Sequence, residues 1–351
     1  MTYLTYYKTA YTEQTEFLDD LPYPQNVHWF PDTYKRANLG LTYPPHKMAE
    51  KVLDPEILKQ LRENPKKSAF ILASGNAHFA GLNQRPYQTR LSYQYKFLPF
   101  TLTQVYAGRI AQSCGATDYI STDASACASS LKVMFDVKML MSVGFERVIV
   151  LAVEDAVSNS VLEFFGESGA SLREDGIKPS AFDNQNYGFY VGQGSAFAVF
   201  EKEPSIKPLG KLVNAYTASE PCDNAIGQRN DGLGFKRAIE GVLEGSSITV
   251  VKTHGTGTKS NNEAEKNALS VLSGFKATSL KPKIGHTMGA SGLLETIILL
   301  ESIQKGIIPK IENRTDDDSV FLSEDATYNG GQILSLAAGM GNIYSSALFE
   351  V

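Results

Sequence analysis

The run at residues 147–154, Arg-Val-Ile-Val-Leu-Ala-Val-Glu, constrains the fold more than any other feature of this 351-residue chain. Its six consecutive apolar residues are too few for a membrane span, which takes about 20 residues, and they lack the polar alternation of a half-buried strand. Such a run is typical of a strand that is buried on both faces. A strand of this kind needs helices on both sides of its sheet, so the run predicts a layered α/β fold.

From about residue 67, short β-rich runs alternate with helical segments, which is the pattern of an α/β domain. Strands are also predicted at residues 68–74, 118–122, 194–203, 211–218, 248–254, 277–284, 332–338 and 345–351. Helices are predicted at residues 128–142 and 291–304, because a glycine follows each segment closely and glycine commonly ends helices.

The chain is expected to divide into three parts. Residues 1–66 are rich in Tyr and Pro, and we expect irregular loops and short helices there because Pro disfavours helix interiors and central strands. Residues 67–205 and 206–351 are expected to form two comparable α/β halves. No internal repeat is visible between them.

Charge and cysteine content exclude several classes of protein. The net charge of −5 and the pI of about 5.7 argue against electrostatic binding to nucleic acid or anionic lipid. Three cysteines without CxxC spacing indicate neither a disulfide framework nor a metal site. No run reaches the ~18 apolar residues of a membrane span, and the first 20 residues hold four acids and no apolar core of a signal peptide. We expect a cytoplasmic protein without a membrane span.

Cys127 lies in a segment of small residues, Ser-Ala-Cys-Ala-Ser-Ser-Leu at 125–131, that joins a predicted strand to a predicted helix. Unpaired N–H groups and the dipole of a helix N-terminus favour a thiolate, which is the nucleophilic form of cysteine. Cysteine is also among the residues most often buried as small apolar groups. The segment alone therefore leaves both a nucleophile and a packing residue open.

Two of the five histidines occupy similar junctions. His254 ends an apolar run and begins His-Gly-Thr-Gly-Thr, and such a strand tip can present an imidazole for acid/base work or merely cap a turn. His286 lies between a predicted strand and a predicted helix, five residues after Lys281. His28, His46 and His78 have no comparable setting and are interpreted as structural or surface residues.

The turn Gly339-Met340-Gly341 near the C-terminus lies between two predicted strands. A Gly-X-Gly turn can direct a backbone N–H at a developing oxyanion, although most such turns are only turns. The turn is thus a candidate for oxyanion stabilisation, but this assignment has weight only in combination with the other motifs.

Together and in this order, these segments resemble the β-ketoacyl synthase family of the thiolase-like superfamily, in its two-histidine elongating type. The resemblance rests on the cysteine segment at 125–131, on His-Gly-Thr-Gly-Thr at 254–258 and on Lys-Pro-Lys-Ile-Gly-His at 281–286, and it covers residues 67–351. It implies a five-layered α-β-α-β-α fold of two similar halves, which forms dimers and has a tunnel leading to the cysteine.

The resemblance also implies a role for each site residue. Cys127 would accept an acyl group from a phosphopantetheine thioester of an acyl carrier protein, and the N–H groups of Cys127 and Met340 would form the oxyanion hole. His254 and His286 would assist decarboxylation of a malonyl thioester and stabilise the resulting enolate. The resemblance assigns support of the second histidine to Lys281 and Glu265, binding of the pantetheine arm to Thr256 and Thr258, and a gating loop to Phe165. No tightly bound cofactor is implied.

Several positions depart from the family pattern. Met340 stands where a gating Phe is usual, and charges are absent at support positions occupied by Asn186, Tyr187, Gln193, Asn261 and Asn262. The N-terminal part is also shorter than usual, which affects the expected dimer contacts. These departures favour a specialised polyketide, polyene or fatty-acid-like pathway over housekeeping fatty-acid synthesis.

Three alternatives stand beside this reading. A thiolase or starter enzyme with a Cys-His-Asn site would show Asn where His286 lies. A non-catalytic chain-length-factor subunit of a heterodimer would typically lack Cys127, although the altered support residues are compatible with weak activity or an obligate heterodimer. An acyl-binding module without chemistry would require three coincidental motifs. Homodimer and heterodimer are both compatible with the sequence.

Overall fold

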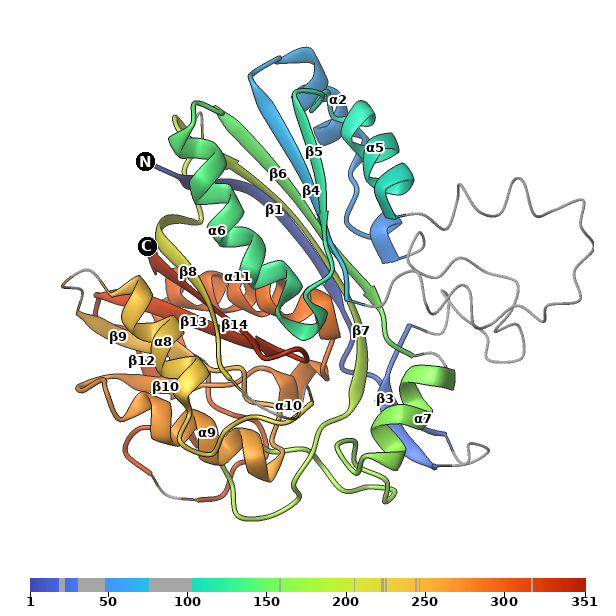
Figure 1. The fold of residues 1–351 in the computed structure, drawn as a ribbon, viewed down its shortest axis with the longest axis vertical. Coiled ribbons are helices and arrows are strands. Elements are labelled where there is room, and N and C mark those ends of the chain that lie inside the picture. The colour runs from blue at the N-terminus through green and yellow to red at the C-terminus, as the bar shows by residue number, and fades with distance from the viewer. Residues whose placement is uncertain are drawn as a thin grey trace, which may run out of the picture.

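The computed structural model describes most of the chain (Figure 1). The described residues are 1–18, 23–30, 48–75, 103–157, 159–204, 206–221, 224, 226–243, 245, 247–316 and 318–351. Within them, a 12-stranded sheet runs in the order β10-β9-β13-β14-β8-β1-β7-β6-β4-β5, with β2 and β3 attached beside β7.

The first half of the sheet centres on the strand that the apolar run predicted. β6 (Arg147–Asp155) is buried at every residue, as are its neighbours β4 (Ser68–Ala73) and β7 (Val191–Glu201). β4 pairs parallel with β6 and with the outer strand β5 (Tyr119–Asp123), whereas β6 and β7 are antiparallel. The predicted two-sided burial of this run is confirmed.

The second half repeats this arrangement of strands. β13 (Gln332–Gly339) pairs parallel with β9 (Ile248–Lys252) and antiparallel with β14 (Ile343–Glu350), and β9 pairs parallel with β10 (Lys276–Thr278). β8 (Gly210–Ser219) completes this half next to β14. A two-stranded sheet, β11 (Ile307–Ile308) with β12 (Ala326–Thr327), lies apart.

The N-terminal segment does not consist only of loops and short helices, so that prediction was wrong. β1 (Tyr3–Tyr11) runs antiparallel to β7 and touches β8 at Tyr3 and Leu4, so it joins the two halves. β2 (Thr15–Leu18) and β3 (Gln25–His28) form a hairpin, and β3 pairs parallel with β7. The prolines begin only after β1, which is rich in the aromatic and β-branched residues that favour strands.

The predicted strand at 277–284 was wrong in its second part. After β10 ends at Thr278, residues Lys281–Ile284 form the short helix α10. Pro282 lies in its first turn, where the fixed φ of proline suits a helix and its missing N–H costs nothing.

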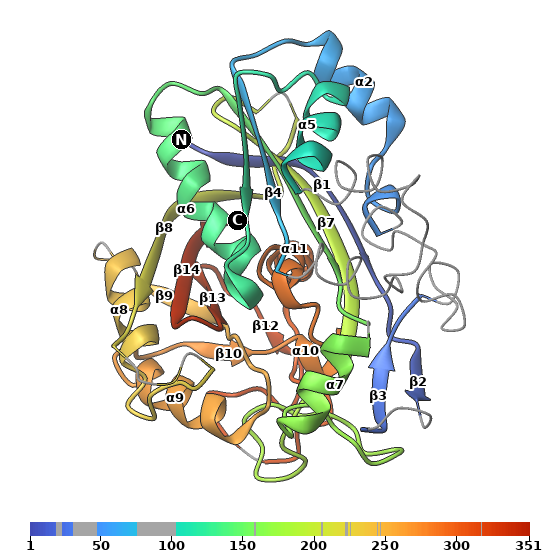
Figure 2. The same ribbon diagram turned by 45° about the vertical axis from the view of Figure 1, so that its right-hand side comes forward.

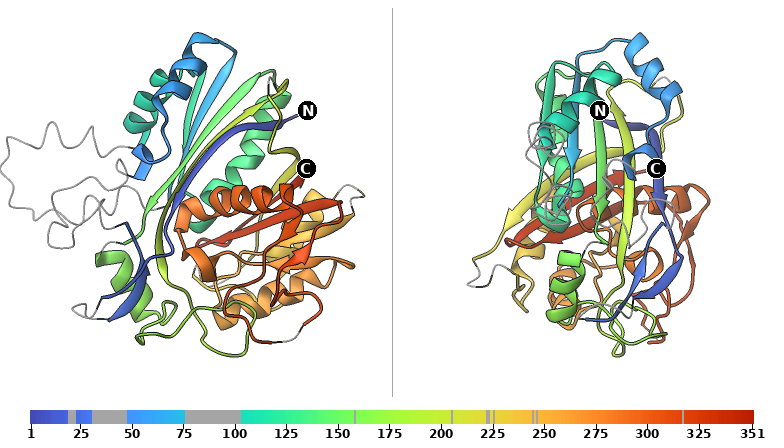
Figure 3. Two further views of the ribbon diagram at one scale, coloured as in Figure 1. Left: turned by 180° about the vertical axis from the view of Figure 1, so that it is seen from behind. Right: turned by 90° about the vertical axis from the view of Figure 1, so that its right-hand side faces the viewer.

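Two helices lie between the halves of the sheet and others cover its outer faces (Figures 1 and 3). α6 (Ser129–Ser142) and α11 (Ser291–Gln304) form the middle layer, and their apolar side chains pack with residues from both halves. α2 (Pro55–Glu63) and α5 (Thr103–Ser113) cover one outer face, and α8 (Leu233–Val242) and α9 (Lys259–Leu269) cover the other. The architecture is therefore a five-layered α-β-α-β-α fold.

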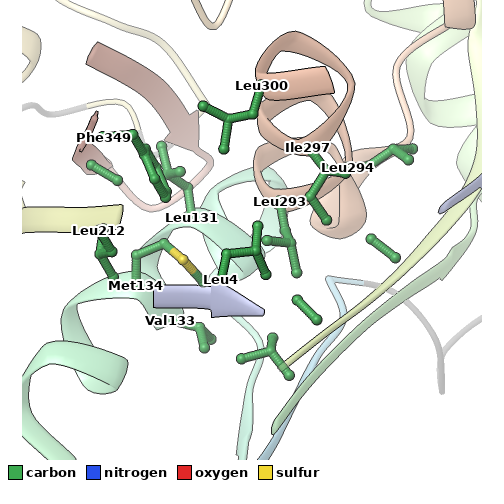
Figure 4. Packing of buried hydrophobic residues seen from close by; sticks show 14 of the residues in the cluster. Leu4, Leu131, Val133, Met134, Leu212, Leu293, Leu294, Ile297, Leu300 and Phe349 are labelled. Carbon is green, nitrogen blue, oxygen red and sulfur yellow. The ribbon is translucent and has the colours of Figure 1, made fainter. Parts of the chain in front are cut away.

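The central core lies where α6 and α11 meet (Figure 4). Burial of each large aliphatic side chain contributes about 1.5–3 kcal/mol, so this contact holds the two halves together. The helices can approach because Gly292 of α11 lies against Leu131 of α6, where an added Cβ would be 2.6 Å from the Leu131 Cβ. Core residues labelled in Figure 4 are Leu4, Leu131, Val133, Met134, Leu212, Leu293, Leu294, Ile297, Leu300 and Phe349.

The two central helices begin alike. Each has 14 residues and follows a three-residue 3₁₀ turn, η3 (Ala126–Ala128) before α6 and η4 (Met288–Ala290) before α11. The first residue of each turn is left-handed, with φ of 48° at Ala126 and 43° at Met288. Residues other than glycine seldom adopt this conformation, and it is characteristic of functional sites.

Helix α7 (Asn159–Glu167) packs beside the β2–β3 hairpin (Figure 2). In the described part of the chain, no helix has both the length and the apolar character needed to cross a bilayer.

Candidate active site

Cys127 lies in the middle of the η3 turn, between β5 and α6, as the sequence predicted. Its side chain is 7% exposed and lines a pocket of about 300 Å³. The strand before it is anchored because Asp123 accepts a hydrogen bond from the Ser125 N–H at 3.0 Å and pairs with Lys132 at 2.5 Å. The fold thus places a buried thiol at the start of a central helix and at the wall of a cavity.

The pKa of Cys127 is raised, whereas the sequence predicted a stabilised thiolate with a lowered pKa. Burial raises the pKa of this thiol to about 12, and the nearby Lys281 ammonium acts in the opposite direction. Desolvation of the charged form therefore outweighs the Lys281 charge. The thiolate form needs a base or a substrate-induced change at the site.

The backbone of His254 is held firmly. Its N–H donates to Glu265 at 2.6 Å, and the N–H of Gly255 donates to the other oxygen of the same carboxylate at 2.7 Å. Asn261 also donates to Glu265 at 2.7 Å. Burial raises the pKa of Glu265 and these N–H groups oppose that shift. The carboxylate therefore fixes the tip of β9, which carries His254.

His286 is fixed through backbone and side chain alike. Its N–H donates to the Tyr190 carbonyl at 2.7 Å, and its Nδ1 lies 3.0 Å from the Ser291 hydroxyl. The Phe189 ring packs edge-on against the imidazole with 5.0 Å between centroids. The two histidine rings are 5.6 Å apart and nearly perpendicular.

Both imidazoles are held in the neutral form. Burial lowers the pKa of His254 and of His286 well below the usual value, and the Lys281 ammonium lowers both further. A neutral imidazole carries one N–H donor and one acceptor nitrogen. The pair can therefore donate hydrogen bonds to a developing negative charge without introducing charge of its own.

Lys281 lies at the centre of the polar network behind the pocket. Its Nζ donates to the His254 carbonyl at 2.5 Å and to Glu295 at 2.8 Å. Its hydrogen bonds, like those of Glu265, thus go to the first histidine segment, whereas the resemblance assigned both residues to the second. The sequence pattern did not identify Glu295 as a site residue, although a lone acid within the apolar helix Leu-Leu-Glu-Thr-Ile-Ile-Leu-Leu was a usable signal.

The pocket brings the predicted residues together. Cys127, His254 and His286 line it along with Thr256, Thr258, Phe165 and Met340. The two threonine hydroxyls are 3.1 Å apart. Further lining residues come from α7, from the segment before β7, from the described residues near Gln228 and from α9, and they include Phe164, Phe189, Asn224, Gln228, Ser260 and Asn261. The pocket is accordingly apolar beside the aromatic rings and polar beside the hydroxyl and amide groups.

Gly339 allows the Met340 turn to approach the nucleophile turn. An added Cβ on Gly339 would lie 2.5 Å from the Ser125 carbonyl oxygen, so only glycine fits there. Met340 follows directly and lines the same pocket as Cys127. This proximity is what a shared oxyanion hole of two backbone N–H groups requires.

The altered support residues find other partners. Gln193 donates to Asp155 at 2.6 Å and accepts from the Phe30 N–H at 2.8 Å, and Asn262 accepts from the Phe182 N–H at 3.2 Å. Asn186 has a left-handed φ of 53°, and Tyr187 is 41% exposed. His28 is buried in β3, away from the pocket lining, and His46, His78 and Cys222 lie outside the described residues.

Comparison with known families gives two matches along the chain. Residues 48–205 match the model of the beta-ketoacyl synthase N-terminal domain, and residues 212–315 match that of the C-terminal domain. The ketoacyl synthase alpha subunit of the tetracenomycin polyketide synthase of Streptomyces glaucescens is 25% identical over 263 residues, which are 68% of this chain and 62% of that protein. A mitochondrial protein of Schizosaccharomyces pombe, provisionally assigned as a 3-oxoacyl-[acyl-carrier-protein] synthase, is 26% identical over 60% of this chain and 55% of its own length.

Solved structures share the fold at low identity. A chain of a type II polyketide synthase complex, in which an acyl-carrier protein is bound to its ketosynthase with a hexaketide, superposes with a TM-score of 0.84, 16% identity and coverage of 100% of this chain and 98% of that chain. The ketosynthase from module 6 of the Bacillus subtilis bacillaene synthase gives a TM-score of 0.80 at 15% identity, covering 99% of this chain and 72% of that chain. The thiolase-like fold is thereby confirmed, and the chain belongs to the β-ketoacyl synthase family.

Proposed function

We propose that this protein is a β-ketoacyl-[acyl carrier protein] synthase that joins a Cys127-bound acyl group to a malonyl unit. The observation that carries the proposal is the convergence of Cys127, His254 and His286 on one pocket. The curated relatives are aligned over only 62% and 55% of their lengths, so the activity is inferred from this geometry as well as from family membership.

The first half-reaction would transfer the acyl group. The Cys127 sulfur attacks the thioester carbonyl of an acyl carrier protein, and the carrier's pantetheine thiol leaves with the proton of Cys127. The N–H groups of Cys127 and Met340 would hold the oxyanion of the tetrahedral intermediate. Thr256 and Thr258, at the polar side of the pocket, would hold the pantetheine arm.

The second half-reaction would form the carbon–carbon bond. The malonyl carboxylate leaves as carbon dioxide, and the electron pair of the broken bond moves into an enolate. His254 and His286, both neutral, would donate hydrogen bonds to the enolate oxygen in a site that excludes bulk water. The enolate carbon then attacks the acyl carbonyl and the Cys127 thiolate leaves.

The acyl side of the pocket supports a specialised substrate. The Phe165 ring contacts those of Phe164 and Phe189 edge to face, with centroids 5.0 and 5.3 Å apart, and Met340 lines the same pocket. Aromatic edges and a flexible thioether suit planar or unsaturated acyl chains as well as saturated ones. A polyketide or polyene pathway is therefore favoured.

The proposed partners are an acyl carrier protein and a second synthase-like subunit. β5 is the last strand of its end of the sheet among the described residues, and its Tyr119 is 44% exposed. An exposed strand edge offers unpaired backbone groups to a second chain. Light scattering of the purified protein, alone and after co-expression with candidate subunits, distinguishes homodimer from heterodimer.

The central test is intact-protein mass after incubation with acyl-loaded carrier protein. We expect an acyl adduct on the wild type and on Cys114→Ala, because Cys114 is buried outside the pocket, and no adduct on Cys127→Ala. The adduct should be discharged by malonyl carrier protein. Absence of an adduct with every carrier and partner subunit would favour the chain-length-factor alternative.

A further inference from the structure

Lys252, the last residue of β9, is a fully buried lysine close to the catalytic pocket. Its Nζ lies 3.1 Å from Oε2 of Glu295, and the other oxygen, Oε1, lies 2.8 Å from Nζ of Lys281. All three side chains are at most 1% exposed. One carboxylate is therefore shared between two ammonium groups in the interior, two residues before His254.

We propose that Lys252 is a positioning residue of the active site: by sharing Glu295 with Lys281, it adds a second positive charge to the layer behind His254 and His286, and this charge favours the neutral form of both imidazoles. The consequence for catalysis rests on the proposed function, but the charge state of the imidazoles does not. Lys252 does not line the pocket, so it acts through the histidines.

The charge balance around the imidazoles supports this role. Lys281 with Glu295 alone would form a neutral pair, and a second ammonium adds a charge that this carboxylate does not compensate. The other buried carboxylate, Glu265, already accepts the N–H groups of His254 and Gly255. Like charges in a buried site disfavour further protonation more strongly than they do in water.

The directions of the pKa shifts agree with the geometry. Burial lowers the pKa of His254, and Lys281, His286 and Lys252 lower it further in that order. The pKa of His286 is lowered by burial, then by Lys281 and Lys252. Burial also lowers the pKa of Lys252 itself, whereas Glu295 raises it. The charged groups that act on the two rings are thus Lys252 and Lys281. Glu295 pairs with both lysines, Glu265 accepts the His254 N–H, and the Cys127 thiol lines the same pocket.

The test is an NMR titration of ¹³C-labelled histidine in the full-length wild type and in Lys252→Met, which keeps length and apolar volume without the charge. We expect the pKa of His254 and His286 to rise in Lys252→Met, because the remaining Lys281–Glu295 pair is neutral. Lys310→Met is the control, since Lys310 is 42% exposed and pairs with Glu312 at 3.5 Å at the surface. Unchanged imidazole titration in Lys252→Met would overturn the proposal.

A double variant separates charge from packing. Lys252→Met with Glu295→Gln removes one cation and one anion, leaves Lys281 alone, and returns the Lys252–Glu295–Lys281 cluster to its wild-type net charge. We expect its histidines to titrate at lower pH than those of Lys252→Met. If Lys252 acted only through packing, the double variant would instead shift the histidine titration further from that of the wild type than the single variant does. If Lys252→Met does not fold, Lys252→Gln replaces it in both variants. A double variant whose histidines titrate at higher pH than those of the wild type would contradict the proposal.

Kinetics then connect the inference to the reaction. In Lys252→Met, a larger fraction of the histidines should be protonated at about pH 6, and protonated histidines do not perform the proposed role of the neutral ones. The ratio of the condensation rate at about pH 8 to that at about pH 6 should therefore rise several-fold. If the wild type forms no Cys127 adduct, the proposed function fails and the NMR titration still decides the role of Lys252. If adducts form and the titration does not move, only the role of Lys252 fails.

Discussion

The Sγ of Cys127 lies 3.8 Å from the Sδ of Met288. Each sulfur belongs to a 3₁₀ turn that begins with a left-handed residue and leads into one of the two central helices. The contact therefore joins the nucleophile, carried by α6, to the start of α11, where His286 is fixed through Ser291. Nucleophile and second histidine are placed relative to one another by the packing of these two turns.

Truncation of Met288 is expected to destabilise the protein and leave a cavity beside the nucleophile. Met288 is 1% exposed, so Met288→Ala should lower the free energy of unfolding by about 2–5 kcal/mol, whereas Met288→Leu should cost less than about 1.5 kcal/mol. Urea unfolding measures both. Met139→Ala serves as control because Met139 is 50% exposed, and an equal loss there would show that burial at the turn is not the cause.

Gly289 is expected to tolerate no side chain. An added Cβ would lie 2.2 Å from the Gly75 backbone nitrogen and 2.8 Å from Glu154, whose carboxylate accepts the N–H groups of Gly75 and Gly289. Gly289→Ala should cost roughly 1–3 kcal/mol by overpacking and slow Cys127 acylation, because the turn that carries Met288 must move. Unfolding and adduct-formation rates measure these effects.

Gly108 provides the matched control for Gly289. It lies in α5 with nothing within 4 Å of an added Cβ, and Gly108→Ala should stabilise the protein by about 0.5–1 kcal/mol. Similar behaviour of the two alanine variants would contradict the close approach at Gly289.

The local patterns in the sequence were sufficient to predict most of the elements. β6 could be predicted because its apolar run has only one plausible environment, and α6 and α11 because a glycine follows each of them closely. The central place of β1 could not be predicted from local pattern, since it depends on pairing with β7 and β8 roughly 200 residues away. Its aromatic and β-branched residues carried a strand signal that the neighbouring prolines obscured.

The site was predictable in its residue types but not in its electrostatics. Cys127 and His254 each follow a strand and precede a helix, as the sequence predicted, whereas His286 follows the short helix α10 instead of the predicted strand. The burial of the thiol, which reverses the expected shift of its pKa, depends on how closely two helices from different halves approach. The Lys252–Glu295–Lys281 cluster was missed for the same reason, because three elements must meet to form it.

Met340 is expected to control which acyl chains reach Cys127. Replacing it with the bulkier, rigid Phe beside Phe165 should reduce loading of branched or aryl acyl groups by about tenfold while short linear groups load within a few-fold of the wild type. Intact-mass time courses with paired acyl carriers measure the ratio. Met139→Phe at the surface should leave the ratio unchanged, and equal slowing of all acyl groups in Met340→Phe would contradict a gating role.

His28 is expected to make the fold sensitive to acid. Burial lowers the pKa of His28 from 6.5 to about 4. Between pH 6.5 and about pH 4, His28 is therefore protonated in the unfolded chain and neutral in the folded chain. The free energy of unfolding should therefore fall by about 1.4 kcal/mol per pH unit from this residue as pH drops below 6.5. In His28→Gln, unfolding measured at pH 7.5 and pH 5 should show a smaller loss, and an unchanged loss would exclude His28 as a cause.

Asp155 acts in the opposite direction. It is buried in β6 and hydrogen-bonded by Gln193 at 2.6 Å, and burial raises its pKa from 3.8 to about 7. The folded state thus binds a proton that the unfolded state has lost between these values, so stability from this group is present at low pH and lost as pH rises to about 7. Ionisation at pH 8 should cost about 2–4 kcal/mol.

Replacement of Asp155 with Asn removes that ionisable group and keeps its shape and its acceptor for Gln193. We expect Asp155→Asn to be more stable than the wild type at pH 8 by about 2–4 kcal/mol and nearly equal to it at pH 4, since the wild-type side chain is then also neutral. Asp175→Asn is the control because Asp175 is exposed. Chemical unfolding at the two pH values decides the matter: a constant difference between Asp155→Asn and the wild type would mean that packing, not ionisation in the interior, sets the stability at this position.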